Sequence, residues 1–121
     1  MSLVKASGVR AFLASGDSGA LRCGSSLLPA LHTKAHGVLL DAASRARDNG
    51  RSTLLGRDVG TSSCARNVIN AAVVKLALQS VHMRCGADVS SALAFAVCAM
   101  LADAVARTKL AGRTTISGDD L

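Results

Sequence analysis

The stretch ARTKLAGRTTISGDDL, from Ala106 to Leu121, predicts a helix end, a glycine stop, a short extended segment and a new helix start. Lys109 falls in the last helical turn, and Gly112 follows where a left-handed residue usually closes a helix. The segment Arg113-Thr114-Thr115-Ile116 is short and β-branched, which favours an extended conformation. Gly118-Asp119-Asp120 then places acidic groups where a helix N-terminus attracts them.

The same pattern occurs earlier, in the stretch SRARDNGRSTLLGRDV from Ser44 to Val59. The two stretches belong to an internal repeat with a period of about 62 residues, and such a period is typical of duplicated structural units. No gap is needed from Leu21 to Val59. The matched positions include Arg22-Cys23-Gly24 with Arg84-Cys85-Gly86, Asp41 with Asp103, Arg45 with Arg107, Gly50-Arg51 with Gly112-Arg113, and Thr53, Gly56 and Asp58 with Thr115, Gly118 and Asp120.

Hydrophobic periodicity predicts the same order of helices in both repeats, residues 1–62 and 63–121. Each repeat alone buries little surface, so we expect the two to share one core. Ser25 or Ser26 in the first repeat, and Asp88 in the second, are expected to cap the long helices. The predicted helices span residues 2–15, 26–49 and a third segment from near Asp58 in the first repeat, and residues 68–78 and 89–108 in the second.

The composition favours closely packed helices and an anionic partner. Half of the 121 residues are hydrophobic, yet only Phe12 and Phe95 are aromatic, and Ala, Val and Leu dominate. Fourteen Lys and Arg residues face eight acids, all of them Asp, which gives a net charge of +6. This excess favours an anionic partner, and nucleic acid is the main candidate.

The sequence shows no pattern typical of catalysis or of a disulfide framework. It contains no Ser/His/Asp, Cys/His or paired-carboxylate constellation and no phosphate-binding loop, so we expect neither an enzyme nor a cofactor. The cysteines have no CxxC spacing, and we expect them to be reduced packing residues of an intracellular protein. They are Cys23, Cys64, Cys85 and Cys98.

The two histidines of the long helix and the apolar runs of the chain predict neither a metal site nor a membrane span. His32 and His36 are four residues apart on a predicted helix, but their repeat equivalents are Ala94 and Cys98. We therefore expect ordinary helix residues there and no metal site. No apolar run reaches membrane-spanning length, so we expect no membrane partner.

The predicted order of short helix, loop, long helix, loop and short helix resembles the histone fold. Residues 106–121 resemble the second loop of archaeal histones, where a Gly-Arg-x-Thr-Ile run precedes an acidic-Asp-apolar helix start. Residues 46–49 resemble the same region of a eukaryotic core histone. Two such folds in one chain resemble the histone doublets of some viruses and archaea. The resemblance implies an all-α fold of two tandem histone folds packed as an intramolecular handshake pair, the second lacking its last helix.

The resemblance also implies a DNA-binding surface. In histones two folds clasp head to tail, so that the first loop of one lies beside the second loop of the other. Such paired loops contact phosphates and the minor groove without reading bases. By position, Arg22 and Arg84 are the minor-groove candidates, with Thr115 holding Arg22 and Thr53 holding Arg84.

Further basic residues fit the same surface by position. Ion pairs of Arg51 with Asp58 and of Arg113 with Asp120 are expected to brace the second loops, and both arginines are also candidates for DNA binding. Additional contacts to the DNA backbone are expected from Lys5, Arg10, Arg66 and Lys75.

The function implied is sequence-tolerant binding and compaction of double-stranded DNA in a nucleus, nucleoid or viral particle. A second doublet and other histone-fold proteins are further candidate partners, and no small-molecule substrate is expected. The alternative is a histone-fold interaction module of a transcription, kinetochore or repair assembly, with little DNA wrapping. Weak DNA affinity and a salt-insensitive partner would favour that alternative.

A final expectation concerns assembly. In histones, the end of the long helix and the third helix meet their counterparts from another molecule in a four-helix bundle. The first repeat keeps material for this face at residues 44–49 and 58–63, whereas the second stops at Leu121 and should leave Val105 and Leu110 uncovered. We therefore expect association through the first repeat and impaired association through the second, which gives pairs rather than filaments.

Overall fold

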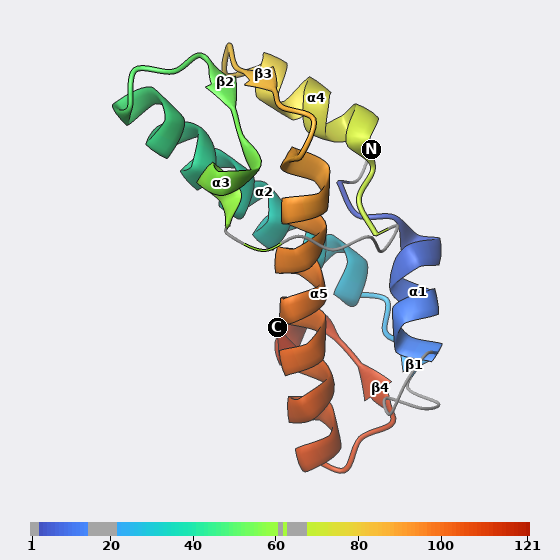
Figure 1. Cartoon of the computed structure of the whole chain (residues 1–121). Helices are drawn as coiled ribbons and strands as arrows, with labels where there is room; N and C mark the ends of the chain where they lie inside the picture. The colour runs from blue at the N-terminus through green and yellow to red at the C-terminus, as the bar shows by residue number, and fades with distance from the viewer. Residues whose placement is uncertain (1–2, 15–21, 61, 63–67) are drawn as a thin grey trace.

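The computed structural model of the chain describes residues 3–14, 22–60, 62 and 68–121. A short helix, a strand, a long helix, a second strand and a final helical turn follow one another twice (Figure 1). The first half contains α1 (Ala6–Ala14), β1 (Arg22–Cys23), α2 (Leu27–Asp48), β2 (Thr53–Leu54) and α3 (Gly56–Val59). The second half contains α4 (Ala71–Gln79), β3 (Arg84–Cys85), α5 (Val89–Leu110), β4 (Thr115–Ile116) and η2 (Gly118–Asp120). The predicted mainly helical fold is confirmed.

The long helices α2 and α5 contain 22 residues each and cross near the middle of the molecule (Figure 1). Small side chains at their buried positions allow the two helices to approach closely. Both helices end before a glycine in the left-handed region, Gly50 at φ 73° and Gly112 at φ 72°, as the sequence predicts. The buried positions correspond at an offset of 62 residues: Leu27 with Val89, Leu31 with Leu93, Ala35 with Val97, Leu39 with Leu101 and Ala42 with Ala104.

The short helices α1 and α4 begin later than predicted because an extended segment precedes each of them. Residues 3–5 lie antiparallel to residues 68–70, with an isolated bridge between Val4 and Ile69. The amide of Lys5 donates a hydrogen bond to the carbonyl of Val68 at 2.8 Å. These backbone bonds replace the first helical turns of the predicted spans 2–15 and 68–78, and they tie the two halves together. Residues 2 and 15 lie outside the described residues.

The two halves differ in the number of residues between the short helix and the first strand. Seven residues, 15–21, separate α1 from β1, whereas four residues, 80–83, separate α4 from β3. The buried positions before these residues accordingly correspond at an offset of 65 residues: Leu3 with Val68, Val9 with Val74 and Leu13 with Leu78. The repeat therefore contains a three-residue difference that precedes the gap-free region starting at Leu21.

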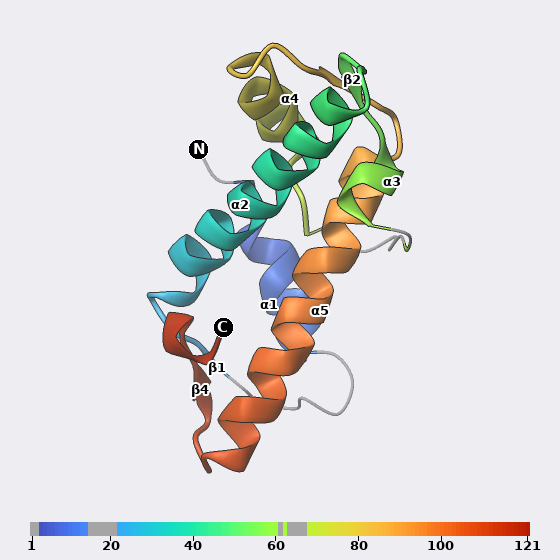
Figure 2. The same cartoon turned by 90° about the vertical axis from the view of Figure 1, so that its left-hand side faces the viewer.

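Two parallel strand pairs lie at opposite ends of the molecule, and each joins one half to the other (Figures 1 and 2). At one end β1 pairs with β4, and at the other β2 pairs with β3. The sequence predicts only loops at residues 22–24 and 82–86. A strand of two residues carries no periodic signal, and it becomes a strand only through its partner in the other half.

One hydrophobic cluster takes residues from both halves, and α5 contributes to it along most of its length. By length and composition, Val89–Leu110 is apolar enough to cross a membrane, with a mean hydropathy of 1.9 over 18 residues. The expectation of no membrane-spanning stretch is therefore wrong by this measure. In the folded chain α5 packs against α2 and α3, and 44% of this 18-residue window is buried.

The third helical segments of the two halves are short and similar. α3 begins at Gly56 rather than near Asp58 and covers four residues, and η2 forms a 3-10 turn of three residues. Leu110 is exposed, as expected. Val105, however, is only 8% exposed and belongs to the core cluster, as its repeat equivalent Ala43 does. The expectation that Val105 is uncovered is wrong, because this row of side chains faces the core in both long helices.

A histidine anchors the start of the described chain. Nδ1 of His32 accepts a hydrogen bond at 3.0 Å from the amide of Leu3, whose side chain is fully buried. His36 lies one turn further along α2, and its ring stacks on that of His32 with centroids 6.0 Å apart. Both side chains are half-buried, but His32 also provides the acceptor that the Leu3 amide needs.

We predict that His32→Ala lowers the free energy of unfolding by about 1–3 kcal/mol more than His36→Ala, because it leaves a part-buried amide without its acceptor. Urea denaturation of both variants at neutral pH measures this difference. His36→Ala is the matched control, since it removes a similarly placed ring. Equal losses would show that the bond between His32 and Leu3 adds no stability.

Candidate nucleic-acid interface

The β1–β4 pair places an exposed arginine at one end of the molecule. Arg22 lies opposite Thr115 in the parallel register. The amide of Arg22 donates to the carbonyl of Thr114 at 2.8 Å, and the amide of Gly24 donates to Ile116 at 2.7 Å. Ile116 is fully buried, whereas Arg22 and Thr115 are exposed. The strand pair is thus anchored in the core on one side and open to solvent on the other.

The β2–β3 pair repeats this arrangement at the opposite end. Thr53 lies opposite Arg84. The amide of Arg84 donates to Ser52 at 2.9 Å, and the amide of Gly86 donates to Leu54 at 2.8 Å. Leu54 is fully buried and Arg84 is exposed. The structure therefore brings together the same two arginine–threonine combinations that the resemblance implies.

The contact in each combination is made by the backbone. Within the described residues, neither the Thr115 hydroxyl nor the Thr53 hydroxyl bonds to the arginine opposite it, and the Arg22 and Arg84 guanidinium groups form no ion pair. The strand register thus sets the position of each arginine and leaves its side chain available to a ligand.

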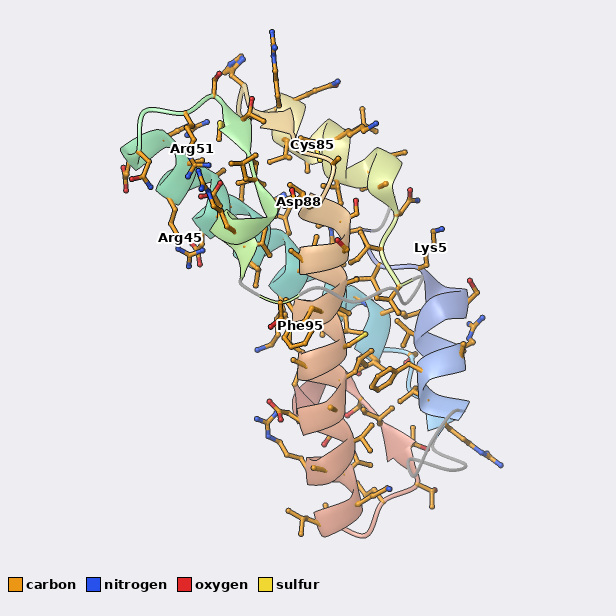
Figure 3. The ribbon with its side chains drawn as sticks, in the orientation of Figure 1. Lys5, Arg45, Arg51, Cys85, Asp88 and Phe95 are labelled. Atoms are coloured by element: carbon orange, nitrogen blue, oxygen red, sulfur yellow. The ribbon has the colours of Figure 1, made fainter. Side chains whose placement is uncertain are left out.

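A part-buried ion pair braces the loop that carries β2. Arg51 donates two hydrogen bonds to the carboxylate of Asp58, at 2.7 and 2.6 Å, and the amide of Leu55 adds a third at 2.9 Å. Arg45, at the end of α2, donates to the carbonyl of Asp58 at 2.7 Å. The hydrogen bonds from Arg51 hold the pKa of the Asp58 carboxyl below its ordinary value, although burial opposes them. Figure 3 shows Arg45 and Arg51 beside α3.

The equivalent pair braces the loop that carries β4. Arg113 bonds to the carboxylate of Asp120, and the amide of Ser117 donates to the same carboxylate at 2.9 Å. Arg107 donates to the carbonyl of Asp120 at 2.7 Å, as Arg45 does to Asp58. The pKa of Asp120 is held below its ordinary value, mainly by the Ser117 amide. Both predicted pairs are present, and both occupy the arginine side chains that were also candidates for DNA binding.

The residues expected to cap the long helices bond instead to the other half. Neither Ser26 nor Asp88 makes a side-chain bond to its own helix. The Ser26 hydroxyl accepts from the amide of Gly118 at 3.0 Å, and the Asp88 carboxylate accepts from the amide of Gly56 at 2.9 Å. Ser26 and Asp88 are the N-cap residues of α2 and α5, as expected, but their side chains bond to the amide at the start of the final helical turn of the other half.

The remaining basic candidates lie on or near the first helices. Arg10 on α1 and Lys75 on α4 are both exposed and correspond at the 65-residue offset. Lys5 is half-buried at the junction before α1 (Figure 3). Arg66 lies outside the described residues.

Three further arginines have structural roles that the sequence did not predict. Arg45 and Arg107 hold the carbonyls of the final helical turns, and the recurrence of an arginine at this position in both repeats was the signal that could have identified them. Arg47 bonds to the Val81 carbonyl of the other half. Its repeat equivalent at the 62-residue offset, Lys109, is also basic.

A small cavity adjoins the exposed arginine of the β2–β3 end. It has a volume of about 240 Å³ and is lined by Lys75, Gln79, Met83, Arg84 and Cys85. Two cations therefore face one hollow, which suits an anionic group. No group of three or more potential metal ligands occurs within the residues that the structure describes.

Comparison with known proteins shows the fold. The chain is similar to the histone from Methanopyrus kandleri, with a TM-score of 0.62 and 17% sequence identity over 97% of this chain and 89% of that chain. No protein-family model matches the sequence, and a search of curated proteins finds no match. The structure therefore has a histone fold.

We predict that acid destabilises the chain through Asp58 and Asp120. Since their pKa values are lowered on folding, the stability they contribute is complete above the unfolded value of about 4 and is lost as pH falls through the folded values. Urea denaturation at pH 7, 5 and 3 should show most of the loss below about pH 4. The double variant Asp58→Asn, Asp120→Asn should be less stable at pH 7 and should lose less between pH 5 and 3. A loss as large as that of the wild type would assign the effect to other groups.

Two glycine substitutions should have opposite effects. A Cβ atom at Gly86 would lie 2.6 Å from the carbonyl oxygen of Leu54, whereas one at Gly37 on α2 would meet nothing within 4 Å. We predict that Gly86→Ala destabilises by about 1–3 kcal/mol, because the strand pair must separate. Gly37→Ala should stabilise by about 0.5–1 kcal/mol. Thermal unfolding followed by circular dichroism compares the two, and a neutral Gly86→Ala would argue against close strand contact.

Proposed function

We propose that the chain consists of two histone folds in tandem, residues 1–62 and 63–121, packed as an intramolecular handshake pair. Three observations support this proposal. The order of elements occurs twice, the buried positions of α2 and α5 correspond at one offset, and each strand pairs with a strand of the other half. The likeness to a single histone chain also extends over 97% of this chain, and hence over both halves.

The proposed function rests on this arrangement: the chain binds and compacts duplex DNA without base specificity. The observation that carries it is an exposed arginine, Arg22 or Arg84, fixed by a parallel strand pair at each end of the molecule. A net charge of +6 favours a polyanionic partner. Arginine side chains held at fixed spacing suit insertion into a minor groove that faces the protein.

The other basic residues divide into two roles under this proposal. Arg51 and Arg113 are bound to Asp58 and Asp120, so they brace the loops rather than carry the main contact. Arg10 on α1 and Lys75 on α4 have exposed side chains that would contact DNA phosphates. The proposed surface also includes Lys5, Thr53, Thr115 and Arg66. The protein would act as a binding protein rather than an enzyme, wherever DNA is packaged: a nucleus, a nucleoid or a viral particle.

A second candidate function is a histone-fold module that binds protein partners, including other histone-fold proteins or a second copy. The exposed apolar side chains of α5 favour it: Phe95 is 44% exposed and Leu110 is 89% exposed. Apolar contacts of this kind depend little on salt, whereas phosphate contacts depend on it steeply.

We predict that the affinity for duplex DNA falls linearly with salt on a log–log scale. The double variant Arg22→Ala, Arg84→Ala should weaken binding to all sequences alike and reduce the slope by roughly 0.9 for each phosphate that is no longer neutralised. Fluorescence anisotropy with two unrelated duplexes at several salt concentrations measures both quantities.

The matched control is Arg45→Ala, Arg107→Ala, which removes the same charge from residues that bond to the Asp58 and Asp120 carbonyls. It should change the slope less than the strand variant does. Absence of wild-type DNA binding at low salt would sink the proposed function. If the two double variants had equal slopes of log affinity against log salt concentration, Arg22 and Arg84 would not belong to the DNA interface.

A further inference from the structure

The two ends of the molecule differ at the residue that precedes each long helix. Ser26 precedes α2, and Asp88 occupies the equivalent place before α5. Each accepts one hydrogen bond from a backbone amide of the other half, at 3.0 Å from Gly118 and at 2.9 Å from Gly56. At both ends, therefore, the residue before the long helix accepts one backbone hydrogen bond from the other half. The acceptor of Asp88 is a negatively charged carboxylate, whereas the acceptor of Ser26 is a neutral hydroxyl.

The carboxylate of Asp88 is fixed next to the β2–β3 pair. A Cβ atom built on Gly56 would lie 2.6 Å from its Oδ2 atom, so the carboxylate packs directly on this backbone. The side chain is exposed and lies four residues after Arg84. Figure 3 shows Asp88 at the start of α5, near Cys85. Arg57 lines the same cavity as Asp88, and within the described residues no cation forms an ion pair with Asp88.

The charge of Asp88 also acts on the strand itself. Burial raises the pKa of the Cys85 thiol, Lys75 lowers it, and Asp88 raises it. Cys85 directly follows Arg84 in β3. Asp88 and Lys75 thus act in opposite directions on the side chain of the residue next to Arg84.

We infer that Asp88 sets the affinity of the β2–β3 end for DNA by repelling the phosphates that Arg84 attracts. This inference rests on the proposed DNA-binding function. A Cβ atom built on Gly86, two residues after Arg84, would lie 3.4 Å from the Asp88 Oδ1 atom. The carboxylate therefore lies beside β3, and its charge offsets part of the attraction that Arg84 exerts on a phosphate. At the other end, the neutral Ser26 hydroxyl makes the equivalent bond without this repulsion.

The test is Asp88→Asn, because an asparagine oxygen still accepts the bond from Gly56 while the charge is removed. DNA affinity should rise about twofold at low salt (about 0.01 M) and about 1.5-fold at about 0.15 M, the screened effect of one unit charge roughly 7 Å from a phosphate. The matched control is Asp103→Asn, which changes the net charge equally on an exposed site. Position 103 lies 15 residues further along α5, which is about 22 Å away.

The reciprocal variant is Ser26→Asp, which places at the first end the residue that the second end already accommodates. It should weaken DNA binding about twofold at about 0.01 M salt, and thermal unfolding of each variant checks that the fold is retained. An Asp88→Asn affinity equal to that of Asp103→Asn would overturn the inference, as would a Ser26→Asp affinity equal to that of the wild type. If the wild type itself fails to bind duplex DNA at low salt, the proposed function fails instead, so the two failures are distinguishable.

Discussion

Neither half of the chain can complete the backbone hydrogen bonds of its own strands. β1 bonds to β4 and β2 bonds to β3, so every strand partner comes from the other half. The bond from Gly118 to Ser26 joins residues 92 positions apart. Because an unpaired backbone group in a protein interior is costly, these loops reach their final geometry only when both halves are in place. The positions of the exposed arginines, Arg22 and Arg84, therefore depend on the strand pairing between the two halves.

The Arg–Asp pairs connect the loops to the long helices. Arg45 and Arg107 hold the carbonyl groups of Asp58 and Asp120, while Arg51 and Arg113 hold the carboxylates. Each final helical turn is thereby fixed to the end of the helix that precedes it. A strand of only two residues gains rigidity from these neighbours, since its own ladder supplies too few bonds to be stable alone. The core, the ion pairs and the strand register therefore act together on the same two arginines.

The sequence predicts the long helices well because 22 residues provide many turns of apolar periodicity and a clear glycine stop. The resemblance to histones implies both Arg–Asp pairs, and the 62-residue repeat places both partners at the same spacing in each half. It could not predict the bonds of Ser26 and Asp88, because a capping residue looks the same whether it bonds to its own helix or to another segment. The extended segment at residues 3–5 was missed for a similar reason, because its partner lies 65 residues away. The burial of Val105 depends on which helix faces it, and this is a property of the tertiary packing.

Three more residues separate α1 from β1 in the sequence than separate α4 from β3. A rotation that exchanges the two halves consequently does not return an identical surface. A dimer of two identical subunits related by a two-fold axis has identical ends, whereas the two ends of this chain differ. On any elongated ligand its two orientations are chemically distinct, so a row of such molecules can possess a direction even when the ligand beneath it has none.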